Sequence, residues 1–291
     1  MQRFFKYALS VLVAVLWITN SFAVTMSPGP SNDLPAAAPA RVPDSQPDKT
    51  LPPGLVPAVP VDSSTALLEL VRQVNRQTFA TLESFVCNEE MRRFKGRISS
   101  SGGRQIDTVT TTVSFENGYE QYSAIHQNDH ARAAISAIGG AWSTGEFGTL
   151  LRQTGDLLKV FPVEFEAYTD LDGTPAAVYA MEIAAPDSPW DLQVRSDHYR
   201  VPFRTEIWVS RATGEILKLA RTSTGIAPGL GISKIEWSIT LRRVELNGKT
   251  WMLPNTGEYT VLYDESGRRE WNELTFTAYR HYGSEVALRF H

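Results

Sequence analysis

The stretch IEWSITLRRVELNG, residues 235–248, decides the fold class. Its first apolar residues alternate with polar ones: Ile235, Trp237, Ile239 and Leu241. A period of two places one face of a β-strand against a core and the other against water. The apolar phase then shifts to Val244 and Leu246, which predicts a β-bulge. Asn247-Gly248 is a two-residue hairpin signal, so we predict a long strand that turns back into an antiparallel partner.

The same pattern recurs along the chain. Residues 108–115 alternate in the same way, and further turn signals stand at Asn117-Gly118, Asp172-Gly173, Thr213-Gly214 and Ser266-Gly267. The predicted strands are 85–98, 105–116, 119–126, 158–170, 175–184, 203–210, 214–224, 232–246, 250–263, 269–281 and 285–290. We therefore predict a mainly β protein with few helices (α+β). Its large antiparallel sheet would curl into a half-open β-barrel, because curling removes exposed edges.

One helix and two insertions interrupt the strands. A helix is predicted over residues 62–84, with one apolar face formed by Leu67, Val71, Val74 and Leu82. Residues 127–157 are rich in small residues, and we expect a loop and a short helix there. Residues 186–202 are predicted to be irregular. Long insertions of this kind often act as lids, so the helix and both insertions are expected to cover the sheet.

The N-terminus has the layout of a secretory signal peptide. Arg3 and Lys6 precede an apolar run that is too short to span a bilayer, and Ser21-Phe22-Ala23 offers small residues for cleavage. The predicted organisation is a signal peptide at 1–23, a disordered Pro/Ala-rich linker at 24–61 and one β domain at 62–291. The mature protein is expected to be periplasmic or secreted. The full chain has a net charge of −4, and cleavage would remove Arg3 and Lys6 and no acid, which leaves the mature chain near −6 and argues against a nucleic-acid partner.

Several polar residues are candidates for chemistry. His126 and His130 have the spacing of two zinc ligands on a helix, but their segment resembles a turn, and we favour two exposed histidines. Asp197-His198 has the residue types of half a hydrolytic constellation, but no nucleophile motif accompanies it. Glu89 and Glu90 would point to opposite faces of a strand and would not share a site. No metal or cofactor is predicted.

A basic run and the single cysteine lie on the first predicted strand. Arg93, Lys95 and Arg97 share one strand face, and we favour a solvated, aggregation-resistant face over a site for anionic headgroups or an acidic partner. Cys87 excludes an intrachain disulfide. We favour a buried small hydrophobe for this residue over an intermolecular disulfide or a reactive thiol.

The segments IWVSRATGEI (207–216) and GKTWMLP (248–254) fit a known pattern. With the helix that follows the signal peptide and the interrupted meander, they resemble the envelope lipoprotein-carrier superfamily, which includes the periplasmic lipoprotein carrier and a sigma-factor-regulating sensor. The chain is also similar to uncharacterised secreted bacterial proteins. The resemblance covers roughly residues 62–291. It implies an incomplete barrel with a helix-covered apolar cavity for acyl chains.

Three aromatic residues of the insertions are the predicted ligand-binding residues: Trp142, Phe147 and Trp190. They lie outside the predicted strands, so strand packing does not explain them. The leading hypothesis is a non-enzymatic cell-envelope protein that binds a hydrophobic ligand, such as lipid or lipoprotein acyl chains, with at most peripheral membrane contact. The alternatives are a protein-binding envelope sensor or scaffold of the same fold, and a hydrolase that uses His198 or His126.

The signal peptide gives a direct prediction. The exported protein should begin near Val24, because Ser21 and Ala23 present small side chains to the peptidase. N-terminal sequencing of the soluble, exported chain measures this. A soluble product that retains Met1 would contradict the assignment.

Overall fold

The computed structural model describes residues 13–15, 63–81, 84–100, 102–116, 119–145, 148–195, 197–264 and 267–281. All of them belong to one compact unit. Except for Val13–Val15, the predicted signal peptide and linker lie outside the described residues, as does the predicted strand 285–290. None of the described helices is both long and apolar enough to cross a membrane.

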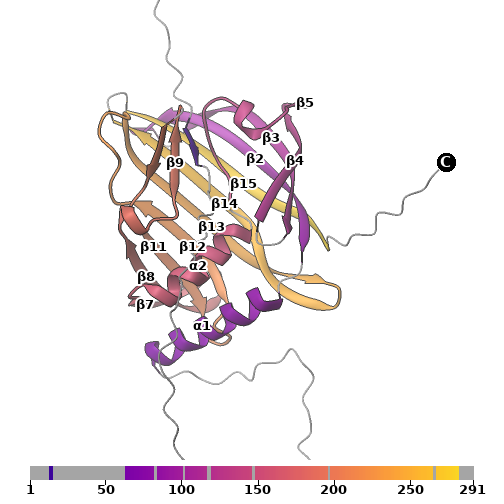
Figure 1. Ribbon diagram of the computed structural model, residues 1–291, viewed down its shortest axis with the longest axis vertical. Coiled ribbons are helices and arrows are strands. Elements are labelled where there is room, and N and C mark those ends of the chain that lie inside the picture. Colours follow the sequence, from indigo (N-terminus) through magenta and orange to yellow (C-terminus); the bar gives the residue numbers. More distant parts are fainter. Residues whose placement is uncertain are drawn as a thin grey trace, which may run out of the picture. The chain divides into compact units, whose positions relative to one another are not determined.

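One antiparallel sheet dominates the protein (Figure 1). Its eleven strands follow in the spatial order β5 (His130–Ala131), β4 (Tyr119–Gln127), β3 (Gly103–Glu116), β2 (Phe85–Arg97), β15 (Arg268–His281), β14 (Lys249–Tyr263), β13 (Ile232–Leu246), β12 (Ile216–Ser223), β11 (Phe203–Ser210), β8 (Thr174–Ile183) and β7 (Glu164–Leu171). The sheet is not closed into a barrel: β5 and β7 are its edges. The predicted fold class, mainly β with a large curled sheet, is confirmed.

The local signals in 235–248 act as predicted. Ile235, Trp237, Ile239 and Leu241 of β13 are buried on one face, which we call the inner face, whereas Val244 beyond the bulge is half-buried. A register shift between Thr240 and Leu241 supplies the bulge. Asn247 and Gly248 both have positive φ (51° and 72°), as a type I′ hairpin turn requires.

Two helices cover part of the inner face. Helix α1 (Ser64–Thr81) buries Leu67 and Val71 as predicted, but its third buried position is Asn75, whereas Val74 is only half-buried and Leu82 lies outside the described residues. Helix α2 (Gly148–Val160) lies across the sheet (Figure 1). Its Gly148 faces the ring of Phe115 so closely that an added Cβ would lie 2.3 Å from that ring. Helix α2 therefore rests directly on β3.

The strand predicted over 158–170 begins too early. Residues up to Val160 belong to α2, and β7 starts only at Glu164. The apolar residues Leu157 and Leu158 continue the helical stripe of α2 toward the core, and a run of apolar residues at this point does not distinguish the end of a helix from the start of a strand.

The insertions contain more regular structure than predicted. Besides the short 3₁₀ turns Ile135–Ala137 and Ala185–Asp187, they contribute β6 (Ala141–Ser143), β9 (Asp191–Val194) and β10 (Asp197–Arg200). These form a second, four-stranded sheet in the order β10-β9-β1-β6. Strand β1 is Val13–Val15, a part of the predicted signal peptide, and it pairs with both β6 and β9. In the full-length chain β1 thus joins the two insertions into one layer, and this strand would be absent after the predicted cleavage.

Candidate functional site

A row of polar and aromatic residues crosses the inner face. Each is the cross-strand partner of the next, from β11 to β3: Thr205, Arg221, Trp237, Tyr259, Asn272, Arg93 and Asp107. All seven are buried, and we call them the polar row. The neighbouring inward row is entirely apolar: Ile207, Leu219, Ile239, Gly257, Leu274, Met91 and Val109. We call these residues the apolar row.

Arg93 and Asp107 form a buried ion pair at one end of the polar row. Arg93 Nε and Nη2 donate to the two carboxylate oxygens of Asp107, over 2.7 and 2.6 Å. The two side chains are only 3% and 4% exposed. Gln127 Nε2 donates to the same carboxylate over 2.6 Å, and Arg132 Nε donates to the side-chain oxygen Oε1 of Gln127. Two charges removed from water in this way are stable only while all their bonding groups are satisfied.

The pKa of Asp107 reflects these contacts. Burial alone would raise it, but hydrogen bonds from Arg93 and Gln127, together with the charges of Arg93 and Arg132, outweigh burial and lower the pKa. The carboxyl group is therefore ionised at neutral pH, and the pair is a true ion pair.

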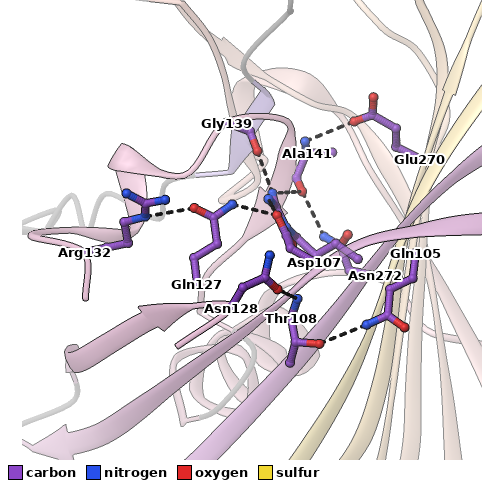
Figure 2. Close-up of polar contacts among 11 residues, drawn as sticks. Gln105, Asp107, Thr108, Gln127, Asn128, Arg132, Gly139, Ala141, Glu270 and Asn272 are labelled. Carbon is purple, nitrogen blue, oxygen red and sulfur yellow. Dashed lines mark hydrogen bonds and ion pairs between the residues drawn. The ribbon is translucent and has the colours of Figure 1, made fainter. Parts of the chain in front are cut away.

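Arg93 also holds the insertion 127–157 against the sheet. Its Nη1 donates to the carbonyl oxygen of Gly139 over 2.7 Å and approaches that of Ala141 at 3.5 Å. Asn272 Nδ2 donates to the Ala141 oxygen over 3.1 Å, and the Ala141 N–H donates to Glu270 Oε2 over 3.2 Å. Figure 2 shows Asn272 and Glu270 beside Ala141, the first residue of β6. We call Arg93, Asp107, Asn272 and Glu270 the latch.

Trp142 directly follows Ala141, which the latch contacts. Its side chain is 0% exposed and belongs to the apolar core. Its Nε1 and the hydroxyl of the neighbouring Ser143 are buried with no hydrogen-bond partner among the described residues. Each such atom costs about 1–3 kcal/mol relative to its solvated state. Phe147, predicted to act beside Trp142, lies outside the described residues.

Trp190 covers the other end of the polar row. It is 2% exposed and packs edge-on against Phe203, with ring centroids 5.7 Å apart. The guanidinium of Arg221 also lies over that ring, 4.7 Å from its centroid. Ser188 holds the loop by donating to the Val201 oxygen. The two predicted tryptophans therefore lie over different ends of the polar row.

The remaining candidates lie elsewhere. His126 and His130 belong to the β4–β5 hairpin, so they do not have the helical spacing of a zinc site. His198 bonds to Asp191 over 2.6 Å, not to Asp197, and joins β9 to β10. Cys87 is a buried free thiol, as predicted, and burial together with the charge of Glu89 raises its pKa.

The paired acids behave as predicted. Glu89 points to the inner face and is buried, whereas Glu90 is exposed, so the two carboxylates do not share a site.

The prediction of a solvated basic face on β2 is wrong for Arg93. Lys95 and Arg97 are exposed, but Arg93 is buried, because β3 supplies Asp107 directly opposite and the insertion closes above the pair. A signal for this existed: Asp107 continues the inward phase of Val109 and Thr111, which places an acid on the buried face of a strand. The pattern of β12 likewise places a charged residue on the buried face, because Arg221 lies two residues beyond the buried Leu219.

No family model and no curated protein matches this chain. Among solved structures, a DUF1329 family protein from Desulfovibrio piger matches over 77% of this chain and 94% of that one, with 11% identity and a TM-score of 0.40. An outer membrane lipoprotein-sorting protein domain from Vibrio parahaemolyticus matches over 75% and 92%, with 9% identity and a TM-score of 0.36. The latter is of the class that the sequence resembles.

The latch gives a stability prediction. Asp107→Asn should lower the free energy of unfolding by about 3–5 kcal/mol, because it leaves the Arg93 charge buried without its counter-charge. Urea denaturation of the purified chain measures this. Glu273→Gln is the matched control: it breaks the neighbouring Arg92–Glu273 pair, whose side chains are 49% and 42% exposed, and should cost less than about 1 kcal/mol.

The same variant should change the pH dependence. The folded pKa of Asp107 is lowered, so its contribution is present above the unfolded pKa of about 3.9 and is lost as the pH falls through the folded pKa. Asp107→Asn should remove that part of the acid destabilisation. An equal loss in Asp107→Asn and Glu273→Gln, or identical pH profiles, would contradict the buried pair.

Proposed function

We propose that this protein is a non-enzymatic cell-envelope protein that binds a hydrophobic ligand, such as lipid or lipoprotein acyl chains, on the inner face beneath its two insertions. The observation that carries the proposal is the apolar row, which lies beside the polar row and under a layer that is not part of the main sheet. Trp142, Trp190 and, from the sequence alone, Phe147 are the proposed ligand contacts. The signal peptide supports the envelope location.

The contacts of insertion 127–157 support its role as a lid. Side-chain contacts at Gly139 and Ala141 hold its β6 segment to the sheet, while Gly145 and Thr149 at the start of α2 donate to side chains of β4. The unsatisfied Trp142 Nε1 and Ser143 Oγ oppose closure. Opening would return both atoms to water and uncover apolar surface, which an aliphatic ligand would then cover. The described arrangement is thus the closed state of the proposed lid.

A protein-binding sensor or scaffold is the second candidate. Strand β7 favours it, because this edge strand is exposed along almost its whole length and carries the exposed aromatic residues Phe165 and Tyr168. An open edge with apolar side chains is suited to pairing with a strand of another protein. The two proposals differ in the surface used: the inner face for the ligand, and the β7 edge for the partner.

Quenching of tryptophan fluorescence distinguishes the two. Methyl dibromostearate, a neutral chain whose bromine atoms quench on contact, should bind the purified chain at micromolar concentration and lower its fluorescence. Trp142→Phe and Trp190→Phe should each remove part of the quenching, because the proposed site lies beside these rings. The replacement by Phe keeps an aromatic side chain in the core and limits the loss of packing.

Trp271→Phe is the control. Trp271 stacks on Phe94, away from the inner face, and its replacement should leave the quenched fraction unchanged. If the ester does not quench at micromolar concentration, or if the double variant Trp142→Phe/Trp190→Phe is quenched as strongly as the unaltered protein, the ligand site is not there and the scaffold proposal replaces it.

A further inference from the structure

The hairpin between β2 and β3 carries an excess of positive charge. Residues 91–106 contain five cations and no acid, although the whole chain has a net charge of −4. Two of the five are engaged in ion pairs: Arg93 with Asp107, and Arg92 with Glu273. The other three are exposed, and we call them the basic rim: Lys95, Arg97 and Arg104.

The basic rim lacks counter-charges. In the part of the chain that the structure describes, no acid lies within ion-pair distance of its three side chains. Lys95 has Glu270 as a cross-strand neighbour, but that carboxylate already serves the latch and Arg268. On its other side Lys95 faces Arg104, and Arg97 faces Arg268. Like charges directly opposite each other destabilise a sheet, so the fold itself does not account for these pairs.

Apolar side chains are exposed beside these cations. Ile98 follows Arg97 directly in the hairpin turn and is 49% exposed. Ile106 lies two residues beyond Arg104 and is 36% exposed. Only six large hydrophobic side chains among the described residues are this exposed, and two of them therefore belong to this one hairpin. Cations combined with projecting apolar side chains are typical of a surface that binds the membrane interface.

We propose that the basic rim docks this protein on a bilayer that contains anionic lipids, with Ile98 entering the interface between headgroups and acyl chains. The lipid phosphates supply the counter-charges that the described residues do not. Each Lys or Arg near such a surface strengthens binding about fivefold, and the attraction fades within a Debye length. A bilayer accommodates a projecting isoleucine without a matching pocket, whereas an acidic protein partner would need one.

The position of the basic rim relates docking to the ligand site. The hairpin lies at the end of the sheet away from α1 (Figure 1). Lys95 stands two residues beyond Arg93 on the same strand and opposite Glu270, so the basic rim continues directly from the latch. Docking therefore brings the latch end of the inner face to the lipid surface. The inference goes beyond the proposed function, because it concerns a surface that the ligand site does not use.

Co-sedimentation with lipid vesicles tests the docking. The exported chain, which lacks the apolar run of the signal peptide, should bind vesicles made of equal parts of phosphatidylcholine and phosphatidylglycerol, and not vesicles of phosphatidylcholine alone. Raising the salt from about 0.1 M to about 1 M should remove most of this binding. The triple variant Lys95→Gln/Arg97→Gln/Arg104→Gln should bind the anionic vesicles about 100-fold more weakly. Its fluorescence should still be quenched by methyl dibromostearate, which shows that the variant is folded.

Lys159→Gln/Lys218→Gln/Arg243→Gln is the matched control, because it removes the same charge from α2, β12 and β13. It should keep most of the affinity for anionic vesicles. Ile98→Ser should weaken binding about two- to tenfold, since its side chain leaves water on docking. Equal losses in the two triple variants, equal binding to both kinds of vesicle, or no binding to either would overturn the inference and leave the proposed function intact. Vesicle binding without quenching by the bromo ester would overturn only the proposed function.

Discussion

The ion pair between Arg93 and Asp107 is the constraint on which the closed arrangement depends. Two opposite charges inside a protein must satisfy each other and their remaining bonding groups, since each lost its hydration on folding. Asp107 obtains a third donor from Gln127, and Arg93 obtains a carbonyl from Gly139. The Gly139 carbonyl belongs to the insertion. The hydrogen bond that helps to satisfy the Arg93 charge therefore forms only when the insertion is closed over the sheet.

The proposed function follows from the balance at this point. The latch favours the closed layer, whereas the buried polar atoms of Trp142 and Ser143 oppose it. At the opposite end of the polar row, Trp190 and Phe203 cover Arg221 by apolar contact. The inner face is therefore closed by two different means: hydrogen bonds at the Arg93 end and aromatic packing at the Arg221 end.

Local sequence patterns predict the strands of the main sheet but not the layer of insertions that covers it. The alternation in 235–248, the bulge after Thr240 and the Asn247-Gly248 turn depend on neighbouring residues, and the structure confirms all three. The alternation of β3 places Asp107 on the inner face, but the carbonyl groups of Gly139 and Ala141 that contact Arg93 lie more than 40 residues away, and a strand pattern contains no information about them. The sequence pattern does not predict β6 and β9 for the same reason. These short strands form because a partner strand is present, not because of their own residues.

The central claim is that insertion 127–157 opens locally, by release of the latch, while the sheet remains folded. Hydrogen exchange of the backbone amides measures this directly. The account predicts that the amides of Ala141–Ser143 exchange with an opening free energy well below that of β13 and β14. It also predicts that Arg93→Met accelerates their exchange while the amides of those two strands keep their protection relative to global unfolding. Exchange of Ala141–Ser143 only through global unfolding, in the unaltered chain and in the variant alike, would contradict the existence of a lid.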